Sequence, residues 1–125
     1  MEEKVKVLIV EDEVLIAQWL TAEMQDLGYN VLDFVTSGEE AIVIAKNQKP
    51  DVLLLDINLS GYIDGIDAAE KIAETLDIPI IFMTGYNEAK IFERAQMMKP
   101  VAYLEKPIDM HNIKPVIESI IKKKK

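Results

Sequence analysis

Four short apolar runs in this sequence each end on polar side chains that suit phosphoryl-transfer chemistry. The runs and the residues that end them are 5–10 with Glu11 and Asp12, 52–55 with Asp56, 80–83 with Thr84, and 101–104 with Glu105 and Lys106. Clustered carboxylates suit a hard cation bound through oxygen, and a central carboxylate can act as a nucleophile. A hydroxyl and an ammonium can hold the oxygens of a transferred phosphoryl group. The combination, rather than any single residue, indicates the chemistry.

If the runs are parallel strands of one sheet, their carboxyl ends meet at one edge. Open α/β sheets bind ligands at that edge. Stretches of helical character separate the runs. We expect helices over 14–27, 41–48, 66–76 and 87–98 and from about 112 onward, with a weaker strand over 29–35. This alternation, with connections too long for hairpins, predicts a doubly wound α/β fold with a parallel sheet and right-handed crossovers.

Several residues mark the expected helix ends. Gly28 is placed to end the first helix in a left-handed conformation, and Ser37 to Glu40 have the Ser-x-x-Glu form of a capping box. Asn87 is a good N-cap for the fourth helix. Pro115 is expected in the first turn of the last helix, because a proline further inside would remove a hydrogen bond and clash.

Composition limits the classes of function. The 125 residues, half of them apolar, predict a single domain with one core. The net charge of -8 opposes direct binding to nucleic acid or to an anionic membrane. The sequence has no cysteine, no signal-peptide pattern and no apolar stretch near the ~20 residues that span a bilayer. We therefore expect a cytoplasmic protein with neither nucleic acid nor a membrane as a direct partner.

Each polar residue taken alone has an ordinary explanation. An acid such as Asp12 or Asp56 after a strand often caps a helix or lies in a loop. Thr84 could be a routine strand end, and Lys106 could be solvated. These explanations weaken together, because four accidents would have to place complementary charges on one edge of one sheet.

The same motifs resemble those of the receiver domains of two-component response regulators, over essentially the whole chain. Glu11-Asp12 resembles the acidic pair of the family, Asp56 its phosphoacceptor, Thr84 its switch hydroxyl, Lys106-Pro107 its Lys-Pro, and Tyr103 its switch aromatic. The resemblance implies a flavodoxin-like three-layer sandwich with strand order 2-1-3-4-5. It also implies a single receiver domain over 1–125 without an output domain.

The resemblance further implies a signalling switch rather than a dedicated turnover enzyme. A sensor histidine kinase or a histidine phosphotransfer protein would supply the phosphoryl group to Asp56. Asp12, Asp56 and the backbone carbonyl of Asn58 would hold Mg²⁺, with Glu11 in a water-mediated or shifted contact. Lys106 and Thr84 would bind the phosphoryl oxygens. Movement of Thr84 and Tyr103 would then reshape the face of helix four, strand five and helix five for a downstream protein partner.

The chain departs from the family pattern at three places. The segment 60–65, Ser-Gly-Tyr-Ile-Asp-Gly, has Ser where many receivers have Pro and is one residue longer. Glu11 replaces the commoner Asp and is one methylene longer, which favours a water-mediated or shifted metal contact. Tyr86 lies two residues after Thr84, where we expect it to obstruct hydrolysis and slow the loss of phosphate.

Other functions fit the sequence less well. An aspartyl-phosphate hydrolase of the haloacid-dehalogenase type is the main alternative, but such enzymes place an Asp two residues after the nucleophile, and Asn58 cannot transfer protons. No glycine-rich nucleotide motif follows the first run. His111, the single histidine, and Lys122 to Lys125 are expected to be solvated.

Overall fold

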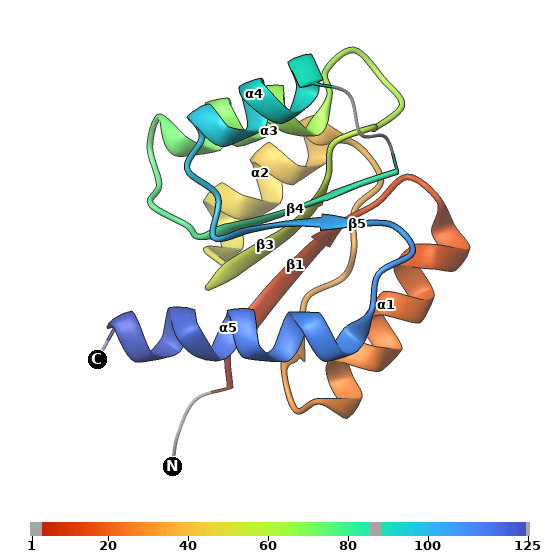
Figure 1. Cartoon of the computed structure of the whole chain (residues 1–125), viewed down its shortest axis with the longest axis vertical. Coiled ribbons are helices and arrows are strands. Elements are labelled where there is room, and N and C mark those ends of the chain that lie inside the picture. Colours follow the sequence, from red (N-terminus) through yellow and green to blue (C-terminus); the bar gives the residue numbers. More distant parts are fainter. Residues whose placement is uncertain (1–3, 86–88, 125) are drawn as a thin grey trace.

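The computed structural model describes residues 4–85 and 89–124, and one parallel sheet runs through the middle of the molecule (Figure 1). Its strands are β1 (Lys6–Val10), β2 (Asn30–Val31), β3 (Val52–Asp56), β4 (Ile80–Thr84) and β5 (Ala102–Glu105). The strand order is β2-β1-β3-β4-β5, and every pair of neighbours is parallel. This confirms the predicted fold class and strand order.

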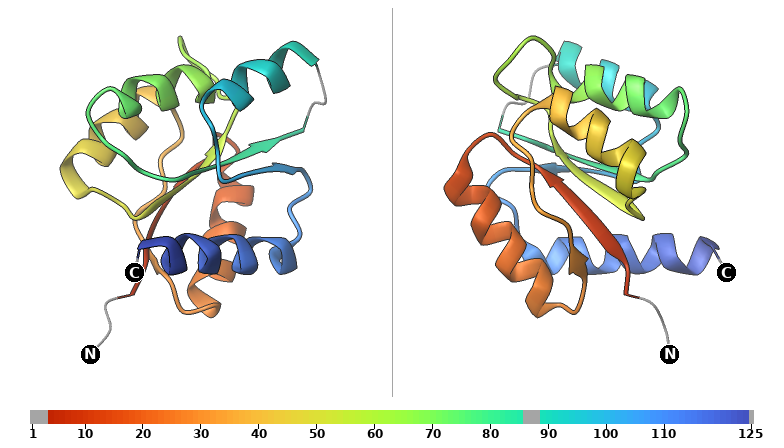
Figure 2. Two further views of the ribbon diagram at one scale, coloured as in Figure 1. Left: turned by 60° about the vertical axis from the view of Figure 1, so that its left-hand side comes forward. Right: turned by 180° about the vertical axis from the view of Figure 1, so that it is seen from behind.

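Helices cover both faces of the sheet. They are α1 (Val14–Asp26), α2 (Gly38–Gln48), α3 (Gly65–Ala73), α4 (Ala89–Met97) and α5 (Met110–Lys124). Helices α2, α3 and α4 pack on one face, and α1 and α5 on the other (Figures 1 and 2). The central strands are therefore buried on both sides, which is why they appear in the sequence as unbroken apolar runs. Within the described ranges, no helix is long and apolar enough to cross a membrane.

Backbone pairing brings the polar ends of the strands to one edge. Asp56 pairs with Met83 in register, and Thr84 pairs with Glu105. Beyond the regular ladder, the Glu11 N–H donates to Val35 O (3.0 Å) and the Lys106 N–H donates to Thr84 O (2.8 Å). The backbone on both sides of the site is thus fixed by hydrogen bonds.

Strand β2 is shorter than predicted. Regular pairing covers Asn30–Val31, and an isolated bridge joins Val35 to Val10. The intervening chain still contacts β1, because the Leu32 N–H donates to Val7 O (2.9 Å). This edge segment therefore follows the sheet without forming a continuous strand over 29–35.

The prediction for the last helix was wrong. Helix α5 begins at Met110 rather than near residue 112, and Pro115 lies inside it, beyond the first turn. Asp109 accounts for the early start, because its side chain accepts the His111 N–H (2.9 Å). Ile113 and Ile117 are buried against the sheet on both sides of the proline. This packing holds the helix across the hydrogen bond that Pro115 cannot donate.

The other helix ends follow the predictions more closely. Gly28 has φ of 98° just after α1, and Ser37 Oγ accepts the Glu40 N–H (3.2 Å) at the start of α2. Helix α2 begins at Gly38, three residues earlier than expected, and α3 ends at Ala73 rather than 76. The predicted cap Asn87 lies outside the described residues.

Candidate functional site

Three polar side chains are buried at the carboxyl edge of the sheet. Among the residues that the structure describes, Glu11, Asp56 and Thr84 are the buried polar or charged ones, each at most 1% exposed. Asp56 is the last residue of β3 and Thr84 the last of β4, while Glu11 directly follows β1. Buried polar groups need partners or a ligand, so this edge is the candidate site.

Lys106 reaches into this cluster from the segment after β5. Its Nζ lies 2.8 Å from Asp56 Oδ2 and 2.6 Å from Glu11 Oε1. The following peptide bond, Lys106-Pro107, is cis. Burial lowers the pKa of Lys106, but its hydrogen bonds to Asp56 and Glu11 outweigh that effect, so the pKa is raised overall. The ammonium is therefore a fixed positive charge beside the Asp56 carboxylate.

Glu11 is the most perturbed acid of the site. Burial, with a smaller contribution from the Asp56 charge, raises the pKa of its carboxyl to about 7, against the opposing effects of Lys106 and of the Glu13 N–H. Oε2 accepts the Glu13 N–H at 3.0 Å. Oε1 lies 2.6 Å from Lys106 Nζ, as an ion pair inside the buried cluster. This buried carboxylate oxygen therefore already faces a positive charge.

Asp12 and Asp56 complete a cluster of carboxylates. Asp12 Oδ2 accepts the Ser60 N–H (3.2 Å), and Asp56 Oδ1 accepts the Asn58 N–H (3.0 Å). One ligand oxygen from each of Glu11, Asp12 and Asp56 lies within 4.8 Å of the other two. An all-oxygen, carboxylate-rich set of this kind fits Mg²⁺ or Ca²⁺ rather than a softer metal. The structure thus brings together the acids and the lysine that the sequence singled out.

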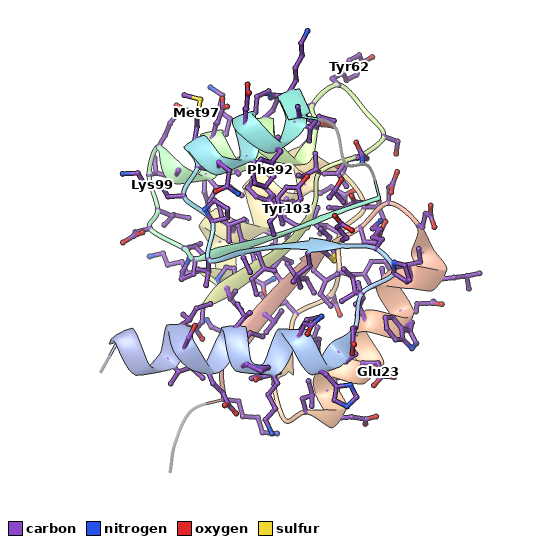
Figure 3. The ribbon with its side chains drawn as sticks, in the orientation of Figure 1. Glu23, Tyr62, Phe92, Met97, Lys99 and Tyr103 are labelled. Atoms are coloured by element: carbon purple, nitrogen blue, oxygen red, sulfur yellow. The ribbon has the colours of Figure 1, made fainter. Side chains whose placement is uncertain are left out.

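The remaining predicted residues lie around this centre. Thr84 is buried at the end of β4, where its backbone carbonyl accepts the Lys106 N–H. Tyr103 lies in β5 and packs edge-on against Phe92 of α4, with ring centroids 5.1 Å apart and an interplanar angle of 78° (Figure 3). Its hydroxyl is buried and has no hydrogen-bond partner within the described part of the chain. Tyr86, predicted to slow hydrolysis, lies outside the described residues.

Sequence reasoning missed some contacts of the segment between Asp56 and α3. A Cβ added to Gly65 would lie 2.1 Å from the carbonyl oxygen of Asp56, so α3 begins directly against the backbone of that residue. Asp64 and Asp67 form a reciprocal capping box at the start of α3. The Asp-x-x-Asp spacing could have indicated this cap. Nothing local indicated that Arg94 of α4 would bind both carboxylates.

Comparison with known proteins gives a family match over most of the chain. The model of the response regulator receiver domain matches residues 7–118. The chain is 36% identical over 113 residues to transcriptional regulatory protein PdtaR of Mycobacterium tuberculosis. The aligned residues cover 90% of this chain and 55% of PdtaR. It is 35% identical over 117 residues to the phyllosphere-induced regulator PhyR of Methylorubrum extorquens, covering 93% of this chain and 43% of PhyR. The chain thus spans about half the length of these relatives.

Solved structures agree with this match. The signal receiver domain of a modulated diguanylate cyclase from Desulfovibrio desulfuricans superposes with a TM-score of 0.91 at 39% identity, covering 98% of this chain and 97% of that chain. A chain of the CheX-CheY-BeF3-Mg²⁺ complex from Borrelia burgdorferi gives a TM-score of 0.84 at 26% identity, covering 94% of this chain and 89% of that one.

Proposed function

Because the chain belongs to the response regulator receiver family, we propose that it is a phosphorylatable signalling switch that accepts a phosphoryl group on Asp56. One observation carries the proposal: the carboxylates of Glu11, Asp12 and Asp56 and the ammonium of Lys106 converge at one edge of the sheet. Such a cluster combines a nucleophile, oxygen ligands for a cation and a positive charge for the incoming group.

Glu11, Asp12 and Asp56, with the backbone carbonyl of Asn58, are the proposed Mg²⁺ ligands. The fit rests on three carboxylate oxygens, one each from Glu11, Asp12 and Asp56, that lie within 4.8 Å of one another, with the side chains of Glu11 and Asp56 buried. Bound Mg²⁺ would neutralise the repulsion between the anionic phosphoryl donor and the attacking carboxylate. The structural neighbour from Borrelia burgdorferi, in a complex with BeF3 and Mg²⁺, supports this cofactor.

The chemistry needs few residues. An oxygen of the Asp56 carboxylate attacks the phosphorus, the bond from phosphorus to the donor breaks, and the donor leaves with that bonding pair. Lys106 already lies 2.8 Å from Asp56 Oδ2, so its charge is in place for the phosphoryl oxygens. The Asn58 N–H fixes the other carboxylate oxygen. Thr84, buried at the neighbouring strand end, supplies a hydroxyl to the same group.

The output of the switch is a change in partner binding. Phosphorylation adds roughly -1.5 to -2 charges if an acyl phosphate resembles a phosphomonoester. Thr84 and Tyr103 respond to this charge, and the surface of α4, β5 and α5 changes for a downstream protein. The partially buried Tyr103 ring and its unpartnered hydroxyl, within the described residues, support a side chain with more than one arrangement.

Upstream, the donor is a sensor histidine kinase or a histidine phosphotransfer protein, and the site of action is the cytoplasm. The chain is a switch rather than a turnover enzyme. The family match does not favour the alternative of a haloacid-dehalogenase-type hydrolase. Asn58 also stands where such an enzyme needs a residue that transfers protons.

The test is incubation with acetyl phosphate and Mg²⁺, scored by intact mass. We expect a phosphoryl adduct on the wild type that requires Mg²⁺ and is absent from Asp56→Asn. Asp77→Asn is the matched control, because Asp77 is an exposed aspartate before β4, away from the site, and it should be phosphorylated normally. An adduct of equal yield on Asp56→Asn would contradict the proposal.

A further inference from the structure

Arg94 joins helix α4 to the start of helix α3. Its Nη1 donates to Asp64 Oδ2 (2.9 Å) and its Nη2 donates to Asp67 Oδ1 (3.0 Å). Asp64 is the N-cap of α3, and Asp67 lies in its first turn. One guanidinium therefore bridges two carboxylates on a neighbouring helix.

The two carboxylates are also held by backbone N–H groups at the start of α3. Asp67 Oδ2 accepts the Asp64 N–H (3.1 Å), and Asp64 Oδ1 accepts the Asp67 N–H (2.8 Å). Arg94 takes the remaining oxygen of each side chain, so all four oxygens have a partner. The hydrogen bond to Asp64 and the charges of both acids raise the pKa of Arg94, against some burial.

The strength of this bridge depends on its geometry. The side chains of Arg94, Asp64 and Asp67 are 43%, 32% and 42% exposed, and an isolated pair at such exposure contributes little. A planar guanidinium that meets two carboxylates already fixed by a cap loses less freedom per hydrogen bond. The bridge therefore connects the two helices more firmly than a solvated lysine pair would.

The capped start of α3 rests on the backbone of Asp56. The Gly65 N–H, next to the N-cap Asp64, donates to Ile57 O (2.8 Å). An added Cβ on Gly65 would lie 2.1 Å from Asp56 O, so no side chain separates the helix from this carbonyl. A displacement of the start of α3 therefore moves Ile57 and the adjacent Asn58, whose N–H holds the Asp56 carboxylate.

Helix α4 has a second attachment on its other side. Phe92 packs edge-on against Tyr103 of β5 (Figure 3). Residues two apart in a helix are roughly 200° apart around its axis, so Phe92 and Arg94 point in nearly opposite directions. One side of α4 contacts the proposed switch aromatic, and the other contacts the start of α3.

We propose that Arg94 is a positioning residue that couples helix α4 to Asp56 through the capped start of α3; this inference rests on the proposed function. Without the bridge, the start of α3 and the segment 57–64 sample more arrangements. The arrangement that reacts is then a smaller fraction of the total, and phosphorylation slows in proportion. Coupling is reciprocal, so occupation of the site must also restrain α4.

The first experiment measures the initial rate of Mg²⁺-dependent phosphorylation by acetyl phosphate, at a temperature where circular dichroism shows every variant folded. We expect Arg94→Gln to be about fivefold slower than wild type, the lower end of typical coupling between sites. Arg94→Lys should fall between the two, because an ammonium lacks the fork that reaches both acids. Arg94→Gln combined with Asp67→Asn should be no slower than Arg94→Gln alone.

Lys71→Gln is the matched control. It removes one positive charge and one exposed ion pair, between Lys71 of α3 and Glu74, the C-cap of that helix. We expect it to be phosphorylated at the wild-type rate. Equal slowing by Lys71→Gln, a wild-type rate for Arg94→Gln, or a double variant slower than Arg94→Gln alone would each overturn the inference.

Amide hydrogen exchange tests the same coupling without phosphorylation. The Gly65 amide should exchange about fivefold faster in Arg94→Gln, in line with the same coupling. The Leu53 amide in β3, which donates to Pro79 O, should be unchanged. An unaltered Gly65 amide, or equal acceleration of both amides, would overturn the inference. A wild type that forms no adduct would instead overturn the proposed function, and the exchange result then decides on the coupling by itself.

Discussion

Single residues of the site carry an excess of negative charge, and two of its three carboxylates are buried. The carboxylates of Glu11, Asp12 and Asp56 lie together, and among the described residues the ammonium of Lys106 is the cation that pairs with Glu11 and Asp56. A buried ion pair made for stability alone would match its charges, because uncompensated charge in the interior is costly. The imbalance is what a site for a divalent cation and a phosphoryl group requires.

Replacement of Lys106 should affect the reaction more than the fold. Lys106→Ala removes the positive charge next to the Asp56 carboxylate, and losing one preorganised donor of this kind costs about 100-fold in rate or more. The rate of phosphorylation by acetyl phosphate, followed by intact mass, checks this. Lys71→Ala, at a mostly exposed lysine of α3, should retain the wild-type rate. A folded Lys106→Ala with a wild-type rate would contradict the role.

Stability without metal should depend on pH through Glu11. Its pKa is about 7 in the folded state against 4.5 as the ordinary value, so the folded state binds the proton more tightly. The stabilisation is complete below pH 4.5 and is lost as the pH rises through about 7. Glu11→Gln, which resembles the protonated form, should lack this loss.

Urea unfolding in EDTA at pH 5 and pH 8 measures the effect. We expect the free energy of unfolding of wild type to fall relative to Glu11→Gln across this range, by at most about 1.4 kcal/mol per pH unit. Parallel pH dependences for the two proteins would contradict the account of Glu11.

At the scale of elements, sequence patterns were most informative for strands buried on both faces. The predicted runs 52–55 and 80–83 differ by one residue from β3 and β4, because such strands are apolar at every position. Edge strand β2 and helix α5 were less predictable. The extent of β2 depends on hydrogen bonds from its partner strand. In α5, the packing of Ile113 and Ile117 overrides the local effect of Pro115.

The junction of β3 and α3 gives a prediction of its own. On helix propensity alone, Gly65→Ala would stabilise the protein by up to about 1 kcal/mol. Because the added Cβ would lie 2.1 Å from Asp56 O, we instead expect a loss of about 1–3 kcal/mol, as for overpacked sites. Chemical denaturation of Gly65→Ala measures the change.

Gly85→Ala is the control for this substitution. Apart from its chain neighbours, no atom of the described residues lies within 4 Å of an added Cβ there, so we expect a change in the free energy of unfolding within about 0.5 kcal/mol. Unchanged or increased stability of Gly65→Ala would show that the start of α3 does not press on Asp56.

At the scale of the whole molecule, topology makes the site from four distant stretches of sequence. The alternation of runs and helices predicted the sheet, and the strand ends predicted Glu11, Asp12, Asp56 and Lys106 as neighbours. Contacts between elements had no local pattern to reveal them. Arg94 lies 30 and 27 residues from its two partners, and the Ser60 N–H reaches Asp12 across 48 residues. Such contacts depend on three-dimensional packing.

Binding of Mg²⁺ should stabilise the whole fold, because the unfolded chain does not hold the three carboxylates together. At a Mg²⁺ concentration 100 times the dissociation constant, the gain is about 2.7 kcal/mol. Urea unfolding in Mg²⁺ and in EDTA measures it. Asp12→Asn should lose most of the gain, and Asp77→Asn should keep it. An unfolding midpoint that is the same in Mg²⁺ and in EDTA would contradict the metal site.

The central claim is that Asp56 carries the phosphoryl group, and localising the modified residue tests it most directly. Borohydride reduces an aspartyl phosphate to homoserine, which peptide mass spectrometry identifies after treatment with acetyl phosphate and Mg²⁺. We predict homoserine at position 56 alone. Homoserine at another aspartate with an unmodified Asp56, or a phosphoryl group on His111, would contradict the account.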